Sequence, residues 1–411
     1  MKKIEVLERG HITNKNLMVF LIVLTAMLSG MGVDIFTPSL PAICNYFQTT
    51  SALVKMTIPV FLVGWAAGVI ILGTLSDSHG RKIIMYTGLI LFTIFNLLTI
   101  FSDSIYMLLL LRGIAGFALG GASTVGRALL PDCFTKKSFA KATAFSVMFF
   151  SLGITIAPLI GGYLQDYIGW KGSFIFMSIF SLITLIIMLL HLPETNLNKK
   201  PLQISTIKND YKIILSSKKY WGALIILTMS YSMLIIFNIY APFILEVKMH
   251  LSAVEFGHYV FFIGLGVLLG AFLNLILICH YKATTLLIFG LFSFLTFTII
   301  FIIFNLLYPL NILCFIIPIF FIYLGGRLTF PNAFMLCLQI FPNKSGSAAG
   351  IMGFLFTILT ALIGFIASLI NSQYSLSLGI FFLIFAIIGI ISYYFLCRDN
   401  ESKNLKLKSK N

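Results

Sequence analysis

The chain has 411 residues, of which 59 % are hydrophobic and only 10 % are charged, with a formal net charge of +15. A soluble domain contains about 45–50 % apolar and about 25 % charged residues, so this composition excludes an ordinary soluble protein. A soluble core of this length could not bury the 41 phenylalanines. The composition therefore indicates a membrane protein in which lipid covers much of the apolar surface.

Apolar stretches of about 20 residues, the length that crosses a bilayer as an α-helix, recur along the whole chain. We predict twelve such spans, at residues 17–40, 53–75, 83–101, 105–130, 142–164, 174–192, 221–245, 256–278, 284–307, 310–338, 348–370 and 376–396. The sequence thus predicts an all-α membrane protein in which both termini lie on the same side of the membrane.

The positive charge is concentrated in alternate loops between the spans. If the N-terminus is cytoplasmic, most Lys and Arg residues fall in cytoplasmic segments, and only Lys55, Lys171 and Lys248 face the outer side. Membrane proteins show this excess of positive charge on the cytoplasmic side. The charge therefore predicts that both termini are cytoplasmic, and it does not indicate nucleic acid as a partner.

A long polar segment divides the spans into two groups of six. We predict an N-terminal six-helix bundle at 1–192, a cytoplasmic linker at 193–219, a C-terminal six-helix bundle at 220–397 and a basic cytoplasmic tail at 398–411. The halves share a short repeat, because "CFTKKSFAKATAFSVMF" (133–149) aligns with "IFPNKSGSAAGIMGFLF" (340–356). Internal repeats are typical of secondary transporters, whose substrate site lies where the repeats meet.

Asp34, in "GVDIFTPSLP", is the only acid that lies well inside a predicted span. Burying a carboxylate is costly unless it takes up a proton or finds a cationic partner. Arg112 in the fourth span is expected at a similar depth, since helices 1 and 4 run in opposite directions. We predict that Asp34 and Arg112 couple proton movement to transport, and a static structural ion pair is the alternative.

The loop after the second span contains "GTLSDSHGRKIIM" (73–85). Gly73 and Gly80 permit a sharp turn between two helices. Asp77 precedes Arg81 by four residues, which brings the two charges within pairing distance on a helix. The pattern predicts paired charges at the cytoplasmic surface, with an ordinary charged turn as the alternative.

The fifth span contains "GITIAPLIGGYL" (153–164). Pro158 cannot donate its backbone hydrogen bond and therefore predicts a kink in the helix. Gly153, Gly161 and Gly162 allow neighbouring helices to approach closely in lipid. From the residues alone, the pattern predicts close helix packing.

These two motifs resemble those of the major facilitator superfamily. The loop is similar to its GxLxDxxGRK signature, with Ser78 and His79 where the family usually has a basic residue. The fifth span resembles the antiporter motif GxxxGPxxGG, with Ala157 in place of one glycine. The resemblance implies two six-helix bundles, export in exchange for protons, and a gating role for the loop that contains Gly73, Asp77, Gly80 and Arg81.

Four further stretches are similar to the bicyclomycin-resistance (Bcr/CflA) branch of the drug:proton antiporters: "DIFTPSLPAI", "GRALLPDCF", "NIYAPFILE" and "FPNKSGSAAGIMG". The resemblance is weaker in the C-terminal half, where "CHYKATT" (279–285) replaces a second gating loop. This resemblance implies a multi-pass protein of the bacterial inner membrane that exports antibiotics such as chloramphenicol, bicyclomycin or sulfonamides.

Arg327, in "GGRLTFPNA", is the only basic residue inside the predicted spans of the C-terminal half. Because Arg112 and Arg327 are opposed by Asp34 alone, we expect neutral, zwitterionic or anionic substrates. Substrate contacts are predicted for Arg112, Arg327, Tyr231, Asn238 and Tyr240, with simple packing as the alternative for the last three. Arg127, near the cytoplasmic end of the fourth span, is predicted to act in gating or to reach the membrane surface.

The main hypothesis is a monomeric, proton-driven exporter of small amphiphilic compounds that needs no cofactor or metal. A dedicated transporter of a single metabolite such as a siderophore, in either direction, is the alternative. The sequence does not indicate an enzyme, because it contains no HExxH, no DxD carboxylate pair and no Ser/His/Asp set. The phosphate loop of a primary pump, GxxxxGK[ST], is also missing from the sequence.

Overall fold

The computed structural model describes residues 15–196, 204–370 and 375–397, which form helices and turns with no strand among them. Twelve helical segments in these ranges are long and apolar enough to cross a membrane. They are Lys15–Tyr46, Ser51–His79, Arg81–Thr99, Ile105–Cys133, Ser138–Tyr167, Lys171–His191, Lys218–Lys248, Ala253–Leu277, Ala283–Leu307, Ile312–Ile340, Gly346–Leu369 and Ser375–Phe395. Each overlaps one predicted span, so the predicted all-α class and the number of spans are confirmed.

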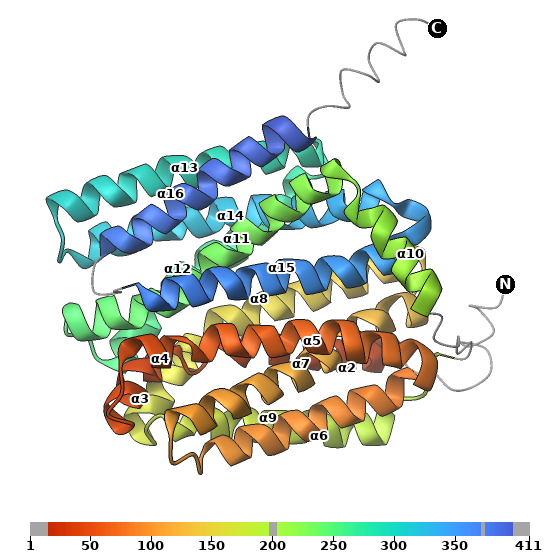
Figure 1. Ribbon diagram of the computed structural model, residues 1–411, viewed down its shortest axis with the longest axis horizontal. Helices are drawn as coiled ribbons and strands as arrows, with labels where there is room; N and C mark the ends of the chain where they lie inside the picture. The colour runs from red at the N-terminus through yellow and green to blue at the C-terminus, as the bar shows by residue number, and fades with distance from the viewer. Residues whose placement is uncertain (1–14, 197–203, 371–374, 398–411) are drawn as a thin grey trace, which may run out of the picture. The chain divides into compact units, whose positions relative to one another are not determined.

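Some spans consist of more than one helical element (Figure 1). The elements are α2 (Lys15–Asp34), η1 (Thr37–Ser39), α3 (Leu40–Tyr46), α4 (Ser51–Lys55), α5 (Thr57–His79), α6 (Arg81–Thr99), α7 (Ile105–Cys133), α8 (Lys136–Tyr167), α9 (Lys171–His191), α10 (Ile204–Leu215), α11 (Lys218–Pro242), η2 (Phe243–Lys248), α12 (Ala253–Leu277), α13 (Ala283–Leu307), α14 (Ile312–Ile340), η3 (Pro342–Lys344), α15 (Ser345–Leu369), α16 (Ser375–Ser392) and η4 (Tyr393–Cys397).

The helices group into two compact units. The first unit comprises Met1–Leu202 and Leu245–Phe261, and the second comprises Gln203–Ile244 and Phe262–Asn411. The predicted linker contains α10, and residues 197–203 within it lie outside the described ranges, as does the predicted tail at 398–411. The predicted ends of the two bundles stay predictions.

In the first unit, glycines bring helix backbones into direct contact. A Cβ atom at Gly64 of α5 would collide with the carbonyl of Gly113 in α7, and one at Gly68 would collide with the carbonyl of Phe117. Small residues allow this approach in lipid, where helices associate through van der Waals packing rather than by leaving water. The pair α5 and α7 therefore forms a tightly packed part of the first unit.

In the second unit, α11 lies against α14, α15 and α16. Nearly all of its side chains from Tyr220 to Pro242 are buried. A helix that is apolar around its whole circumference is expected to be buried on all sides. At the periphery of this unit, α13 and α16 run side by side (Figure 1).

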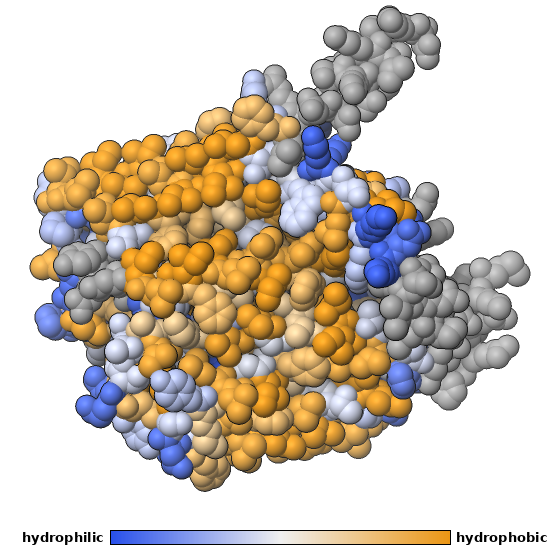
Figure 2. All heavy atoms as spheres, viewed as in Figure 1, coloured by the Kyte–Doolittle hydropathy of each residue, from blue (hydrophilic) through white to orange (hydrophobic). Residues whose placement is uncertain are grey.

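Large apolar side chains cover the flanks of the helices. Figure 2 shows hydrophobic residues over most of the visible helix surfaces, with hydrophilic residues gathered mainly at the helix ends. Exposed examples are Phe101, Leu190 and Phe289. An apolar surface of this extent is unusual for a soluble monomer, and it matches helices whose flanks contact lipid.

Candidate functional site

Arg81 holds a charged network at the junction of α5 and α6. Its guanidinium lies 2.6 Å from a carboxylate oxygen of Asp77 and 3.1 Å from one of Asp132. It also donates a hydrogen bond of 2.6 Å to the hydroxyl of Ser76. The Arg81 side chain is 13 % exposed and that of Asp77 is 62 % exposed, so the network reaches the surface of the unit.

Gly80 separates α5 from α6 and adopts φ = +112°, which residues with a side chain rarely adopt. A Cβ atom there would also collide with the carboxylate of Glu194. Glu194 accepts hydrogen bonds from the backbone N–H groups of Arg81 (3.0 Å) and Lys82 (3.3 Å). A carboxylate in this position stabilises the N-terminus of α6, and only glycine leaves room for it.

Asp132 and Glu194 belong to this network, although the sequence analysis did not single them out. Asp132 comes from the last turn of α7 and Glu194 follows the end of α9. The amide of Asn196 adds a hydrogen bond of 2.8 Å to the backbone carbonyl of Asp77. The second, fourth and sixth spans are predicted to end on the same side of the membrane. Acids directly at those ends could therefore have been expected to converge on Arg81.

Asp34 is the last residue of α2 and is buried, with only 4 % of its surface exposed. The helix ends there because Pro38 has no N–H to donate to the Asp34 carbonyl, and the hydroxyl of Thr37 donates to that carbonyl instead, at 2.7 Å. Arg112 of α7 is 2 % exposed and donates a hydrogen bond of 3.1 Å to the carbonyl of Gly32. Asp34 and Arg112 therefore lie in the same region of the first unit, and direct pairing of their side chains stays a prediction.

Aromatic rings surround the guanidinium of Arg112. Its central carbon lies 4.1 Å from the ring centre of Phe61, 4.3 Å from that of Phe36 and 5.8 Å from that of Phe174. A desolvated cation over such rings gains about 2 kcal/mol from each favourable contact. The Nε atom has no hydrogen-bond partner among the described residues, so the guanidinium can serve one more acceptor.

The glycines of the fifth-span motif face the backbone beside Asp34. A Cβ atom at Gly161 of α8 would collide with the carbonyl of Ile35, and one at Gly153 would lie 2.7 Å from the carbonyl of Met27. The motif thus lets α8 lie directly against α2 and the turn that follows it. A side chain at position 161 would displace the turn that begins at Asp34.

Another face of α8 contacts the start of α12. A Cβ atom at Gly162 would collide with the carbonyl of Ala253. Gly257 of α12 faces the carbonyl of Pro158, and a Cβ atom at this glycine would lie 2.7 Å from that oxygen. Packing on two helices therefore accounts for the spacing of these small residues, and a role in antiport stays a prediction.

Lys55 is a buried cation that the sequence analysis placed on the outer side. It ends α4 and is only 1 % exposed. An ammonium group inside a membrane protein is a candidate functional group, because its burial requires a compensating interaction. A signal was present in the sequence, since Lys55 falls inside the predicted span 53–75 and follows Val54, which is also buried.

A small cavity of about 10 Å³, with room for about one water molecule, lies in the second unit. Its lining includes Arg327, Tyr231, Ser230, Tyr323 and Phe330. The guanidinium carbon of Arg327 lies 5.9 Å from the ring centre of Phe330. Two predicted substrate contacts, Arg327 and Tyr231, therefore share one cavity.

The other predicted contacts lie elsewhere. Tyr240 is fully buried, and its hydroxyl donates to the carbonyl of Ala367 at 3.2 Å, which is a packing contact, so its substrate contact stays a prediction. Asn238 is also buried and does not line this cavity. Arg127 is exposed and donates to Thr124 of its own helix at 3.5 Å.

Gly73 lies inside α5 rather than in the turn that the loop motif predicts. A Cβ atom at Gly73 would lie 3.0 Å from the side chain of Thr124 in α7. Gly73 therefore provides room for α7, and the turn itself depends on Gly80.

Comparison with known proteins connects this arrangement to a family. Residues 22–364 match the Major Facilitator Superfamily. An uncharacterized transporter of Rickettsia bellii is 26 % identical, over 90 % of this chain and 94 % of the relative. A chloramphenicol resistance protein of Acinetobacter baumannii is 24 % identical, over 79 % of each chain. A bicyclomycin resistance protein homolog of Haemophilus influenzae is 25 % identical, over 96 % of this chain and 99 % of the relative.

The fold is also similar to a solved structure. The crystal structure of a D-xylose-proton symporter matches with a TM-score of 0.79 and 15 % identity, covering 93 % of this chain and 97 % of that chain. At this identity the likeness concerns the fold alone.

Proposed function

Because the chain belongs to the major facilitator superfamily of membrane transporters, we propose that it is a proton-coupled antiporter that exports small amphiphilic compounds by alternating access. Membership of this family makes it a transporter rather than an enzyme. The proposal rests mainly on one observation: Arg112 is buried, and it donates a hydrogen bond to the carbonyl of Gly32, two residues before the buried acid Asp34. Opposite charges in one dry region are what proton coupling requires.

In the proposed cycle, Asp34 alternates between a charged and a protonated state. While charged, Asp34 orients Arg112 for substrate binding, since opposite charges attract strongly away from water. A proton that enters from outside neutralises Asp34, releases Arg112 and weakens the substrate contact. The protonated and substrate-bound states then exclude each other, which links inward proton movement to outward substrate movement.

The Arg81 network supports a gate at the predicted cytoplasmic end. Arg81 draws together the end of α5, the end of α7 and, through its backbone N–H, the segment after α9. In the proposed cycle, these contacts loosen together when this end opens. We therefore assign gating to Asp77, Gly80 and Arg81, with Gly73 setting the distance between α5 and α7, and we place both termini in the cytoplasm.

The substrate class follows from the buried charges. Arg112 and Lys55 outnumber Asp34 among the charged groups buried inside the spans, and the partly buried Arg327 and Glu246 offset each other, so neutral, zwitterionic or anionic compounds fit better than permanent cations. Arg327 and Tyr231 line one cavity that now has room for about one water molecule, and in the proposed cycle it widens to admit an amphiphilic compound. The relatives named for chloramphenicol and bicyclomycin resistance support antibiotics as test substrates, and a bacterial inner membrane as the location.

A second candidate function is the transport of one anionic metabolite such as a siderophore. The surplus of buried cations favours it, because an anion would balance them. Under either function the proton gradient supplies the energy, and the proposed transporter works as a monomer without a cofactor.

Accumulation of labelled chloramphenicol in an efflux-deficient bacterial host tests the proposal. We expect cells with the protein to accumulate less chloramphenicol, and expect a protonophore or Asp34→Asn to abolish the difference. The matched control is Asp166→Asn, which neutralises an exposed acid of the same unit. Equal accumulation with and without the protein for chloramphenicol and bicyclomycin, together with movement of a labelled siderophore, would favour the second candidate.

A further inference from the structure

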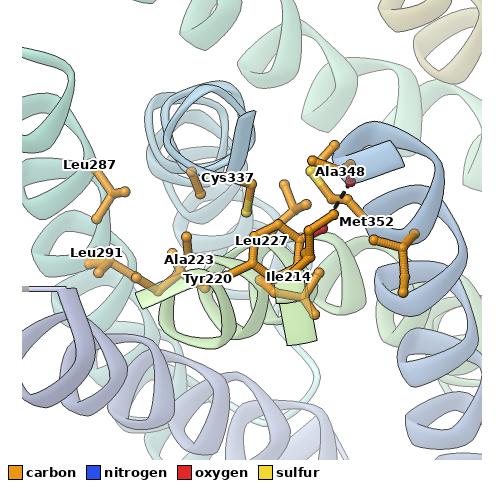
Figure 3. Close-up of a cluster of buried hydrophobic side chains, with 13 residues drawn as sticks. Ile214, Tyr220, Ala223, Leu227, Leu287, Leu291, Cys337, Ala348 and Met352 are labelled. Atoms are coloured by element: carbon orange, nitrogen blue, oxygen red, sulfur yellow. Dashed lines mark hydrogen bonds between the residues drawn. The ribbon is translucent and has the colours of Figure 1, made fainter. Parts of the chain in front are cut away.

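The linker helix α10 is docked on the second unit by an apolar contact. Ile214 is fully buried, although it belongs to a helix whose Lys208 and Lys212 are exposed. Figure 3 shows Ile214 beside Tyr220 of α11 and near Met352 of α15. One face of α10 is therefore part of the hydrophobic core of the second unit.

A charged contact lies next to the apolar one. The carboxylate of Asp210 accepts hydrogen bonds from the ammonium of Lys344 at 2.7 Å and from the hydroxyl of Ser347 at 3.0 Å. The hydrogen bonds from Lys344 and Ser347 hold the pKa of the Asp210 carboxyl below its usual value. Asp210 thus binds α10 to the first turn of α15 and to the residue just before it.

Two more hydrogen bonds tie the same end to α11. The indole N–H of Trp221 donates to the carbonyl of Leu215 at 2.8 Å. The hydroxyl of Tyr220 donates to the carbonyl of Ala348 at 2.9 Å, the dashed line in Figure 3. The end of α10, the start of α11 and the start of α15 are therefore joined in one cluster.

From this cluster, α11 and α15 lead to the cavity beside Arg327. At 1.5 Å per residue, Tyr231 lies about 16 Å along α11 from Tyr220, and Phe356 lies about 12 Å along α15 from Ala348. The rings of Tyr231 and Phe356 pack edge to face at 5.4 Å. Phe330 packs on both, at 6.0 Å and 6.3 Å, so the spacing of α11 and α15 sets the position of two cavity-lining rings.

The internal repeat gives Lys344 a counterpart in the first unit. Lys344 corresponds to Lys137 in the aligned segments 340–356 and 133–149. The loop 73–85 of the first unit carries an acid, Asp77, that pairs with Arg81, whereas "CHYKATT" (279–285), at the corresponding place in the second unit, contains none. In the second unit, Asp210 supplies the acid from outside the repeat.

We propose that Asp210 is a positioning residue for transport: by binding Lys344 and Ser347 it holds α15 against α10 and α11, and so fixes the aromatic lining of the cavity beside Arg327. The inference rests on the proposed substrate contact at that cavity. Asp210 does not touch the substrate, so its loss should weaken substrate binding more than it slows the transport cycle.

Transport kinetics of labelled chloramphenicol in proteoliposomes test the role of Asp210. We expect Asp210→Asn to raise KM about two- to fivefold with a nearly unchanged maximal rate, as befits one partly exposed ion pair. Lys208→Gln, which removes an exposed charge from the same helix, should leave KM unchanged. The double variant Asp210→Lys with Lys344→Asp should recover most of the loss. A wild-type KM in Asp210→Asn, or a double variant as impaired as either single change, overturns the inference.

A reversible cross-link provides an independent check. In Asp210→Cys combined with Ser347→Cys, KM should be raised under reducing conditions and return toward the wild-type value when the disulfide forms, while either single cysteine should not respond. Equal KM values in both redox states contradict the proposal. Arg327→Gln separates the two ideas. If only Asp210→Asn raises KM, positioning stands, and the substrate contacts the rings of Tyr231 and Phe330 in the cavity rather than Arg327. If only Arg327→Gln raises KM, positioning by Asp210 is overturned.

Discussion

The first unit pairs Arg81 with an acid four residues away in the same loop, whereas the second unit pairs Lys344 with an acid from the linker helix. Both pairs lie at the predicted cytoplasmic end. The first pair belongs to a local motif, and Asp132 strengthens it from a neighbouring helix. The second depends on a contact between residues 134 positions apart. The difference shows that a charged contact at this end can be made within one loop or with an acid supplied by the linker helix.

The units also differ in how they hold their intramembrane arginines. Arg112 is enclosed by phenylalanine rings and bound to a backbone carbonyl close to Asp34. Arg327 is partly exposed and lines a small cavity with Tyr231. This contrast supports a division of work in which the first unit couples the proton to substrate release through Arg112, and the second adds a further substrate contact at Arg327.

Substituting Arg112 in the first unit and Arg327 in the second should give the largest difference in transport kinetics between the units. Arg112→Gln is expected to reduce proton-driven efflux at least about a hundredfold, because under the proposed pairing it leaves the buried Asp34 carboxylate without its cation, at a cost of about 3–5 kcal/mol. Arg327→Gln should raise KM about tenfold, which corresponds to about 1.4 kcal/mol. Initial rates of labelled chloramphenicol transport over a range of concentrations measure both. Equal losses of maximal rate in the two variants would contradict the division of work.

Glycine-to-alanine substitutions should lower stability where α8 lies against the turn after α2 in the first unit, and should not do so at an open position in the second. Gly161→Ala places a methyl group against the Ile35 carbonyl, so we expect a loss of about 1–3 kcal/mol of stability and reduced transport. Gly346→Ala meets no atom within 4 Å and should be neutral or stabilise α15 by about 0.5–1 kcal/mol. Thermal unfolding of the purified protein in detergent compares the two, and similar midpoints would refute the close approach at Gly161.

Removing the two cytoplasmic ion pairs should lower the thermal unfolding midpoint by amounts that differ less. Arg81→Gln removes contacts to Asp77, Asp132 and Ser76, whereas Lys344→Gln removes one ion pair of a more exposed side chain. Exposed pairs contribute about 0.2–1 kcal/mol, so Arg81→Gln should lower the unfolding midpoint more than Lys344→Gln does. A larger shift for Lys344→Gln would reverse the comparison between the units.

The smallest expected effect concerns pH. The folded pKa of Asp210 lies below its usual value, so the stability that the carboxylate contributes is fully present above the usual pKa and is lost only as the pH falls through the lowered one. Between about pH 5 and 8, the effect of Asp210→Asn on KM should therefore stay constant. Kinetics across this range check the expectation, and an effect that disappears toward pH 5 would show that Asp210 takes up a proton there.

Much of this architecture could be predicted from the sequence, because each span that crosses lipid needs a run of about 20 mostly apolar residues. Runs of apolar residues predicted all twelve spans, and local spacing brought Asp77 and Arg81 within pairing distance. Asp34 was identifiable because an acid inside an apolar run is conspicuous. These features depend on residues that are close together in the chain.

Features that depend on distant parts of the chain could not be predicted in the same way. The backbone cap formed by Glu194 and the pairing of Asp210 with Lys344 arise only when helices pack. Tyr240 is an aromatic residue with a polar group, as a substrate contact often is, but its hydroxyl donates a hydrogen bond to the carbonyl of Ala367 on a neighbouring helix. Polar residues on a buried helix look alike in the sequence, whether they face a cavity or another helix.

Proton–substrate exchange can be measured most directly in proteoliposomes with an imposed pH gradient. Vesicles with an acidic lumen should accumulate labelled chloramphenicol as protons leave, a protonophore should abolish the accumulation, and vesicles with Asp34→Asn should show none. Accumulation driven by protons entering from an acidic medium, or accumulation that is unchanged in Asp34→Asn, would contradict exchange at Asp34.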